Sequence, residues 1–117
     1  MTTPMRLDVK DIAGVNCITS SDGQTLYDKI HPELKAGNIV ELSFKGVRVL
    51  ASPFFNAAIG QLLRDISATR LNDSLKVIDL PPNGVETLKK VIENSRSFYA
   101  SQKNQEAVTE ALKQEGQ

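Results

Sequence analysis

The sequence lacks the residues that most metal and disulfide sites need. It has no tryptophan, one cysteine and one histidine in 117 residues. A single cysteine excludes an internal disulfide, which suits a reducing compartment. A metal site needs several convergent ligands, and Cys17 and His31 are 14 positions apart. We therefore expect neither a disulfide framework nor a bound metal.

The sequence also has no excess of charge of one sign and no long apolar run. Lys plus Arg and Asp plus Glu both total 14, for a net charge of zero. This balance gives no electrostatic footprint for nucleic acid or an anionic membrane. No segment approaches the ~20 apolar residues that span a bilayer, and the first residues, MTTPMRLDVKD, lack the apolar core of a signal peptide. We expect a soluble, cytoplasmic protein that binds neither nucleic acid nor membrane.

The length is close to the commonest size of one domain. We predict one domain over residues 1–100 and a polar tail over residues 101–117. In the tail, Val108, Ala111 and Leu112 support only a weak helix, which either frays or docks on a partner.

Alternating apolar residues predict three strands, over residues 5–9, 39–44 and 75–80. Cys17 and Ile18 add a short extended piece. Helical spacing predicts a helix capped within residues 20–22 with a kink or break at Pro32, a second from Ser52 to Ile66, and a third from Asn83, as cap, to Tyr99. Residues 47–50 and 68–74 are predicted connections. This alternation indicates an α/β fold, with a mostly parallel or mixed sheet of about four strands and helices packed on it.

The segment from Ile39 to Leu63 is the most informative part of the sequence, because it is predicted to form a strand, a loop and a buried helix. Ser52 and Pro53 are favoured as N-cap and first residue of a helix. That helix is apolar nearly all round, which indicates burial on more than one side or a partner on the second side. We expect Phe54 and Phe55 not to point inward together, and Gly60 to allow close approach to the sheet.

No motif indicates catalysis. The glycines form neither a dinucleotide-binding nor a phosphate-binding loop. An enzyme would have to use Cys17, Asp22 or Ser52, but no base-and-nucleophile pair is evident. We expect Cys17 to be a small buried hydrophobe and His31 to have a surface or hinge role. The prediction is a protein without catalytic residues or cofactor.

Two residues of the Ser52 helix have alternative readings. Ser52 is either a simple N-cap or a phosphorylation site, because a helix start tolerates phosphate. Asn56 is either a buried hydrogen-bonding residue or a recognition residue.

The segments GVNCITSSDGQTLYDKI and VELSFKGVRVLASPFFNAAIGQLL resemble the STAS-like family known as DUF4325. The most specific part is F-x-G-V followed by S-P-F-F-N-A-A-I-G. STAS domains include anti-anti-sigma factors, which bind an ATPase-fold kinase and carry an Asp-Ser-Ser-Gly signature whose second Ser is phosphorylated. Here Ala51, Ser52, Pro53 and Phe54 occupy those positions, so the phosphoacceptor is missing.

The resemblance implies a non-catalytic regulatory module that binds a protein, with an ATPase of the histidine-kinase type as a candidate partner. We predict that the partner contacts Leu50, Ser52, Pro53, Phe54 and Asn56. The alternative is a small-molecule or nucleotide sensor that uses the backbone amides at the Pro53 helix start.

Overall fold

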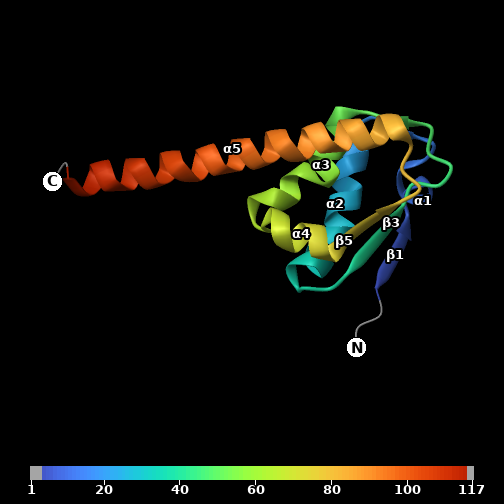
Figure 1. Ribbon diagram of the computed structural model, residues 1–117, viewed down its shortest axis with the longest axis horizontal. Helices are drawn as coiled ribbons and strands as arrows, with labels where there is room; N and C mark the ends of the chain where they lie inside the picture. Colours follow the sequence, from blue (N-terminus) through green and yellow to red (C-terminus); the bar gives the residue numbers. More distant parts are fainter. Residues whose placement is uncertain (1–3, 116–117) are drawn as a thin grey trace.

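The computed structural model describes the backbone of residues 4–115 and the side chains of residues 4–100. Figure 1 shows a layered body from which one long helix extends. The α/β class is confirmed. In chain order the elements are β1 (Met5–Asp8), α1 (Val9–Ala13), β2 (Asn16–Cys17), α2 (Ser20–Lys35), β3 (Val40–Ser43), β4 (Val49–Leu50), α3 (Ser52–Ala58), the 3-10 helix η1 (Gly60–Arg64), α4 (Ala68–Ser74), β5 (Leu75–Ile78) and α5 (Pro82–Glu115).

The main sheet has three strands in the order β1-β3-β5, and both pairs are parallel. Its register aligns Met5, Val40 and Leu75 and, two residues further on, Leu7, Leu42 and Val77, so these apolar residues share one face. Helical crossovers permit this parallel pairing. The opposite face carries a row of charged residues, Arg6, Glu41 and Lys76.

A second, two-stranded sheet pairs β2 with β4 in parallel, with Cys17 opposite Leu50. We call this sheet the ribbon. The extended piece predicted at Cys17 is strand β2, whereas the predicted connection 47–50 contains strand β4, and about four strands in one sheet were predicted. The described residues form five strands in two sheets. Strands of two residues are too short to show a period-2 pattern.

Helix α2 begins and continues differently from the prediction. Its N-cap is Thr19, one residue before the predicted caps, and the Thr19 hydroxyl accepts a hydrogen bond from the Asp22 amide at 3.1 Å. The predicted break at Pro32 is wrong, because α2 continues to Lys35. Pro32 lies in the last turn, and the buried Ile30 and Leu34 on either side of it hold the helix on the core.

The predicted helix from Ser52 to Ile66 is divided into two parts. Helix α3 ends at Ala58, and η1 follows from Gly60. Glycine has a low helix propensity, which favours the change at this point. The predicted connection 68–74 is instead helix α4, capped by the Ser67 hydroxyl, which accepts from the Arg70 amide at 3.2 Å.

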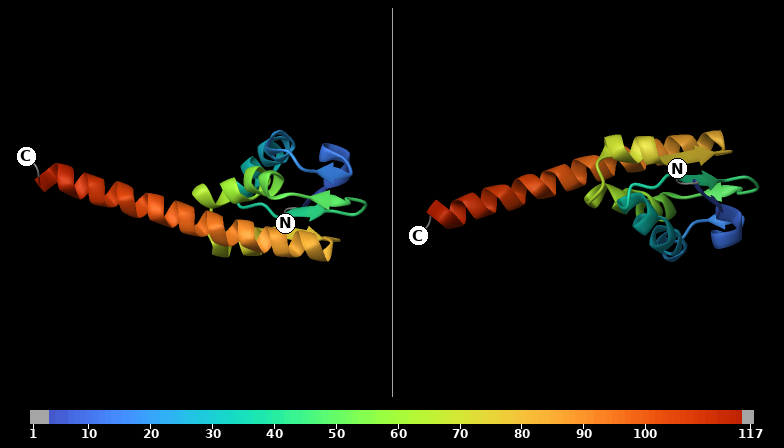
Figure 2. Two further views of the ribbon diagram at one scale, coloured as in Figure 1. Left: turned by 90° about the horizontal axis from the view of Figure 1, so that it is seen from above. Right: turned by 90° about the horizontal axis from the view of Figure 1, so that it is seen from below.

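Helix α5 begins at Pro82, one residue before the predicted cap Asn83, and its backbone continues to Glu115. Proline suits a first helical position. In both views of Figure 2, α3 lies between α2 and α5, and it contacts both helices. This central position explains why α3 is apolar nearly all round.

Candidate functional site

The residues predicted to bind a partner lie where the ribbon ends and helices α2 and α3 begin. The Ala51 amide donates to the Cys17 carbonyl at 3.0 Å, so the starts of the two helices are held side by side. Cys17 and Leu50 point inward and are buried, whereas Ile18 and Val49 are 45% and 42% exposed.

Ser52 and Pro53 are exposed at the start of α3. We call Ile18, Val49, Ser52 and Pro53 the ribbon rim. No sequence pattern predicts that Ile18 and Val49 are exposed, because each belongs to a segment too short to show which face it presents.

The expectation that Phe54 and Phe55 cannot both point inward is wrong. Both are 0% exposed. Their rings meet edge to face at 5.7 Å, and Phe55 also lies 6.0 Å from Phe44. Consecutive helical residues point about 100° apart, and α3 has neighbours on both sides, so the two rings enter one core in different directions. Phe54 is therefore a core residue and is not available to a partner, which removes the main apolar contact that the sequence had suggested.

The structure also differs from the predictions that Leu50 contacts a partner and that Ser52 is an N-cap. Leu50 is only 7% exposed and packs close to Gly84 at the start of α5. Ala51, not Ser52, is the N-cap of α3, and it makes no side-chain capping bond. The Ser52 side chain is exposed rather than occupied in capping. Phosphorylation of Ser52 stays a prediction.

Asn56 is exposed, so the reading as a buried hydrogen-bonding residue is wrong. It lines a shallow groove of ≈ 240 Å³ between α3 and α5 together with Gly60, Ser95, Phe98 and Tyr99. Phe98 is 61% exposed, the most among the large apolar side chains described as exposed. Asn56 lies one helical turn after Ser52, which places this groove next to the ribbon rim.

Cys17 is a buried hydrophobe, as expected. Burial raises the pKa of its thiol to about 11, and the negative charge of Asp22 acts in the same direction. The thiol therefore stays protonated at neutral pH, whereas a nucleophilic cysteine needs its thiolate. Among the described residues, the hydrogen-bond partner of the thiol is the Gly14 carbonyl, to which Cys17 Sγ donates at 3.7 Å, and a carbonyl cannot act as the base.

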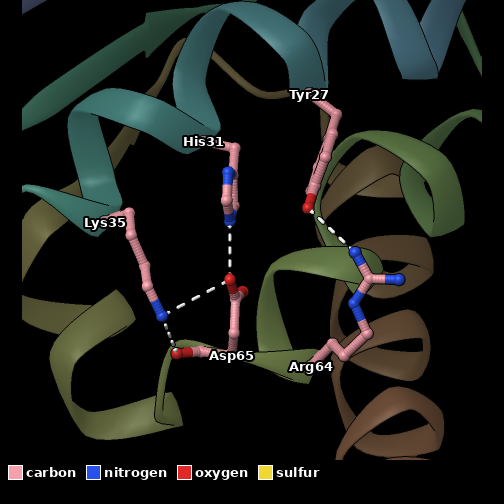
Figure 3. A network of polar contacts seen from close by, with 5 residues as sticks. All are labelled: Tyr27, His31, Lys35, Arg64 and Asp65. Atoms are coloured by element: carbon pink, nitrogen blue, oxygen red, sulfur yellow. Dashed lines mark hydrogen bonds and ion pairs between the residues drawn. The ribbon is translucent and has the colours of Figure 1, made fainter.

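His31 joins α2 to the segment after η1. Its Nε2 lies 2.8 Å from Asp65 Oδ2, and its ring stacks on Tyr27 at 4.9 Å. Lys35 donates to the Asp65 carbonyl at 3.3 Å, and Arg64 donates to the Tyr27 hydroxyl at 3.5 Å. Figure 3 shows these five side chains as one network. His31 thus anchors two segments together, a role that its place before Pro32 did not suggest.

This network lowers the pKa of the Asp65 carboxyl group. Burial raises its pKa, but the hydrogen bond and charge of His31, together with Lys35, outweigh burial and lower the pKa below 3.8. Asp65 therefore stays ionised near neutral pH. Because every member of the network pairs with another, we assign it a structural role.

The described residues contain no group of three or more His, Cys, Asp or Glu that could hold a metal. Among the helices of residues 4–115, none has the length and apolarity to cross a membrane.

The comparisons with known proteins identify the family. The model of the family described as STAS-like domain of unknown function (DUF4325) matches residues 22–85, from the first turn of α2 to the first turn of α5. This match covers more than half of the chain, and the chain belongs to that family. The searches of curated proteins and of solved structures found no match.

Proposed function

We propose that this STAS-like domain is a regulatory module that acts by binding a protein partner and not by catalysis. The observation that carries the proposal is the ribbon rim, where Ile18 and Val49 expose apolar surface beside Ser52 and Pro53. Two exposed apolar side chains close together cost solvation free energy that a partner would recover. We therefore propose that the partner contacts the ribbon rim and not Phe54.

The first candidate partner is an ATPase of the histidine-kinase type. Support comes from the resemblance to anti-anti-sigma factors, whose signature region corresponds to residues 51–54 of this chain. Pro53 occupies the phosphoacceptor position and is exposed, so phosphorylation there cannot release the partner. Binding in this chain would instead be set by partner concentration or by another modification.

A capture experiment with matched variants tests the proposal. Ile18→Asp and Val49→Asp place a charge on the ribbon rim, whereas Ile39→Asp places one on a residue that is 40% exposed just before β3. Ile39 serves as the control because it lies just before the N-terminal end of β3, whereas β4 of the ribbon comes after the C-terminal end of β3 in the chain. Each tagged variant is used to capture proteins from extracts of the cells that make it, and captured proteins are identified by mass spectrometry.

We expect the wild type and Ile39→Asp to capture an ATPase of this type, and both ribbon variants to lose it. Equal capture by all four proteins, each folded by circular dichroism, would contradict the ribbon rim as the interface. If the wild type captures no ATPase, the proposal that the partner is an ATPase of the histidine-kinase type would be wrong.

A further inference from the structure

A second surface lies between β5 and α5. Strand β5 and helix α5 leave the short turn at 79–81 and diverge, and α4 lies toward the open end (Figure 1). The space between them is a groove of ≈ 580 Å³. We call it the β5–α5 groove. This volume falls in the range of about 300–1,000 Å³ typical of small-molecule sites.

Most of the residues that line this groove are apolar, although Thr69, Asn72 and Arg96 line it as well, and the rest of the chain covers the lining incompletely. Its floor is buried, and its walls consist of apolar residues that the rest of the chain covers only in part. The floor residues are Ile59, Leu63 and Leu71, and the half-buried wall residues are Ala68, Leu75, Val77, Leu88 and Ile92. Strand β5 pairs only with β3 among the described strands, so no further strand fills the space beside it. An apolar occupant would complete the burial of these walls.

The polar lining residues are few and are not spread evenly. The α5 wall runs Leu88, Ile92, Arg96, one residue per helical turn. Arg96 is therefore ~12 Å along the helix from Leu88, on the side away from the turn. The other polar lining residues, Thr69 and Asn72, come from α4. Arg96 is exposed and forms no ion pair with any described side chain.

We propose that the β5–α5 groove binds a small amphipathic anion, with its aliphatic body along Leu88 and Ile92 and its carboxylate against Arg96. A guanidinium offers two parallel donors to a carboxylate, and among the described side chains that of Arg96 is the only charged one that lines the groove. A peptide helix or strand would need apolar contacts repeated over a longer surface. The single cation at the end of an apolar trough fits a fatty carboxylate of medium length better. The site does not depend on the proposed function at the ribbon rim.

The test compares octanoate with 1-octanol, which has the same chain without the charge. Both are titrated into the full-length protein and followed by amide chemical shifts. We expect saturable binding of octanoate, with shifts confined to residues 59–63, α4, β5 and residues 88–96 of α5. Arg96→Gln should weaken octanoate about tenfold and leave octanol unchanged. Arg70→Gln, an exposed arginine of α4 outside the lining, is the matched control and should change neither.

Filling the groove provides a second measurement. Ala68→Leu adds volume at a half-buried lining position and should weaken both ligands in a protein that still melts cooperatively. Absence of saturable binding, shifts centred outside the groove, or equal effects of Arg96→Gln and Arg70→Gln would each overturn the proposal. Capture of a protein partner that is lost in Arg96→Gln, without octanoate binding, would also overturn it in favour of a peptide site.

Discussion

At the scale of single residues, Gly23 fixes how closely α2 approaches α3. A Cβ placed on Gly23 would lie 2.8 Å from the Ala57 Cβ and closer still to the Phe54 carbonyl oxygen. Alanine normally gains about 1 kcal/mol over glycine in a helix, but here the two helices would have to separate. We expect Gly23→Ala to lower the free energy of unfolding by about 1–2 kcal/mol, because overpacking strain exceeds the propensity gain. Urea denaturation measures the change.

Lys29→Ala, at an exposed position of the same helix, serves as the control and should change stability by less than about 0.5 kcal/mol. Stabilisation by Gly23→Ala would show that α2 and α3 do not pack as closely as described.

The Asp65 network gives a prediction about pH. Because the folded pKa of Asp65 lies below its ordinary value of 3.8, its contribution to stability is fully present above that value. It is lost as the pH falls through the folded pKa. The side chain of Asp65 is 31% exposed and pairs with His31 and Lys35, so Asp65→Asn should cost about 0.5–1 kcal/mol at pH 7.

That cost should shrink below pH 4 as the wild-type carboxylate is protonated. Melting temperatures of wild type and Asp65→Asn between pH 2.5 and 7 test this prediction, with Asp28→Asn, an exposed carboxylate of α2, for comparison. A difference between wild type and Asp65→Asn that stays constant down to pH 2.5 would contradict the network's electrostatic role.

At the scale of secondary-structure elements, Gly60 and Ser95 fix the packing of η1 against α5. The sequence predicted that Gly60 permits close approach to the sheet, but a Cβ at Gly60 would lie 2.6 Å from Ser95 Oγ of α5. We expect Gly60→Ala to destabilise the protein by about 1–2 kcal/mol. Replacing Ser95 with alanine removes the hydroxyl in conflict, so Gly60→Ala should cost clearly less in the Ser95→Ala background.

A double-mutant cycle measured by chemical denaturation gives this coupling directly. A coupling energy near zero would mean that contact with the Ser95 hydroxyl does not cause the cost of Gly60→Ala.

The strands and helices that sequence reasoning recovered are those with a repeating pattern. Val40, Leu42 and Phe44 alternate and are all buried, and Leu26, Ile30 and Leu34 repeat at helical spacing on α2. The site was harder to predict, because its geometry depends on neighbours distant in sequence. Whether Phe54 faces solvent is decided by α2 and α5, and no local pattern in residues 50–56 records their positions.

At the scale of the whole molecule, the described residues present two separate surfaces on one core. The ribbon rim follows the strands of the ribbon, and the β5–α5 groove lies between β5 and α5. Both surfaces involve residues next to α5, since Leu50 of the ribbon packs near Gly84 and the groove is walled by Leu88 and Ile92. A shift of α5 along its axis would therefore change both surfaces together.

The division into a domain of residues 1–100 and a tail stays a prediction, and α5 makes it testable. Val91 is buried, Ser95 is 9% exposed and Tyr99 packs against the core. A chain ending at residue 100 keeps all these contacts, so its melting temperature should lie within about 2 °C of the full chain, which corresponds to under about 0.5 kcal/mol. A chain ending at residue 90 loses them and should not fold cooperatively. Calorimetry of the three chains measures this, and a 1–100 chain that melts as poorly as 1–90 would show that residues 101–117 belong to the folded unit.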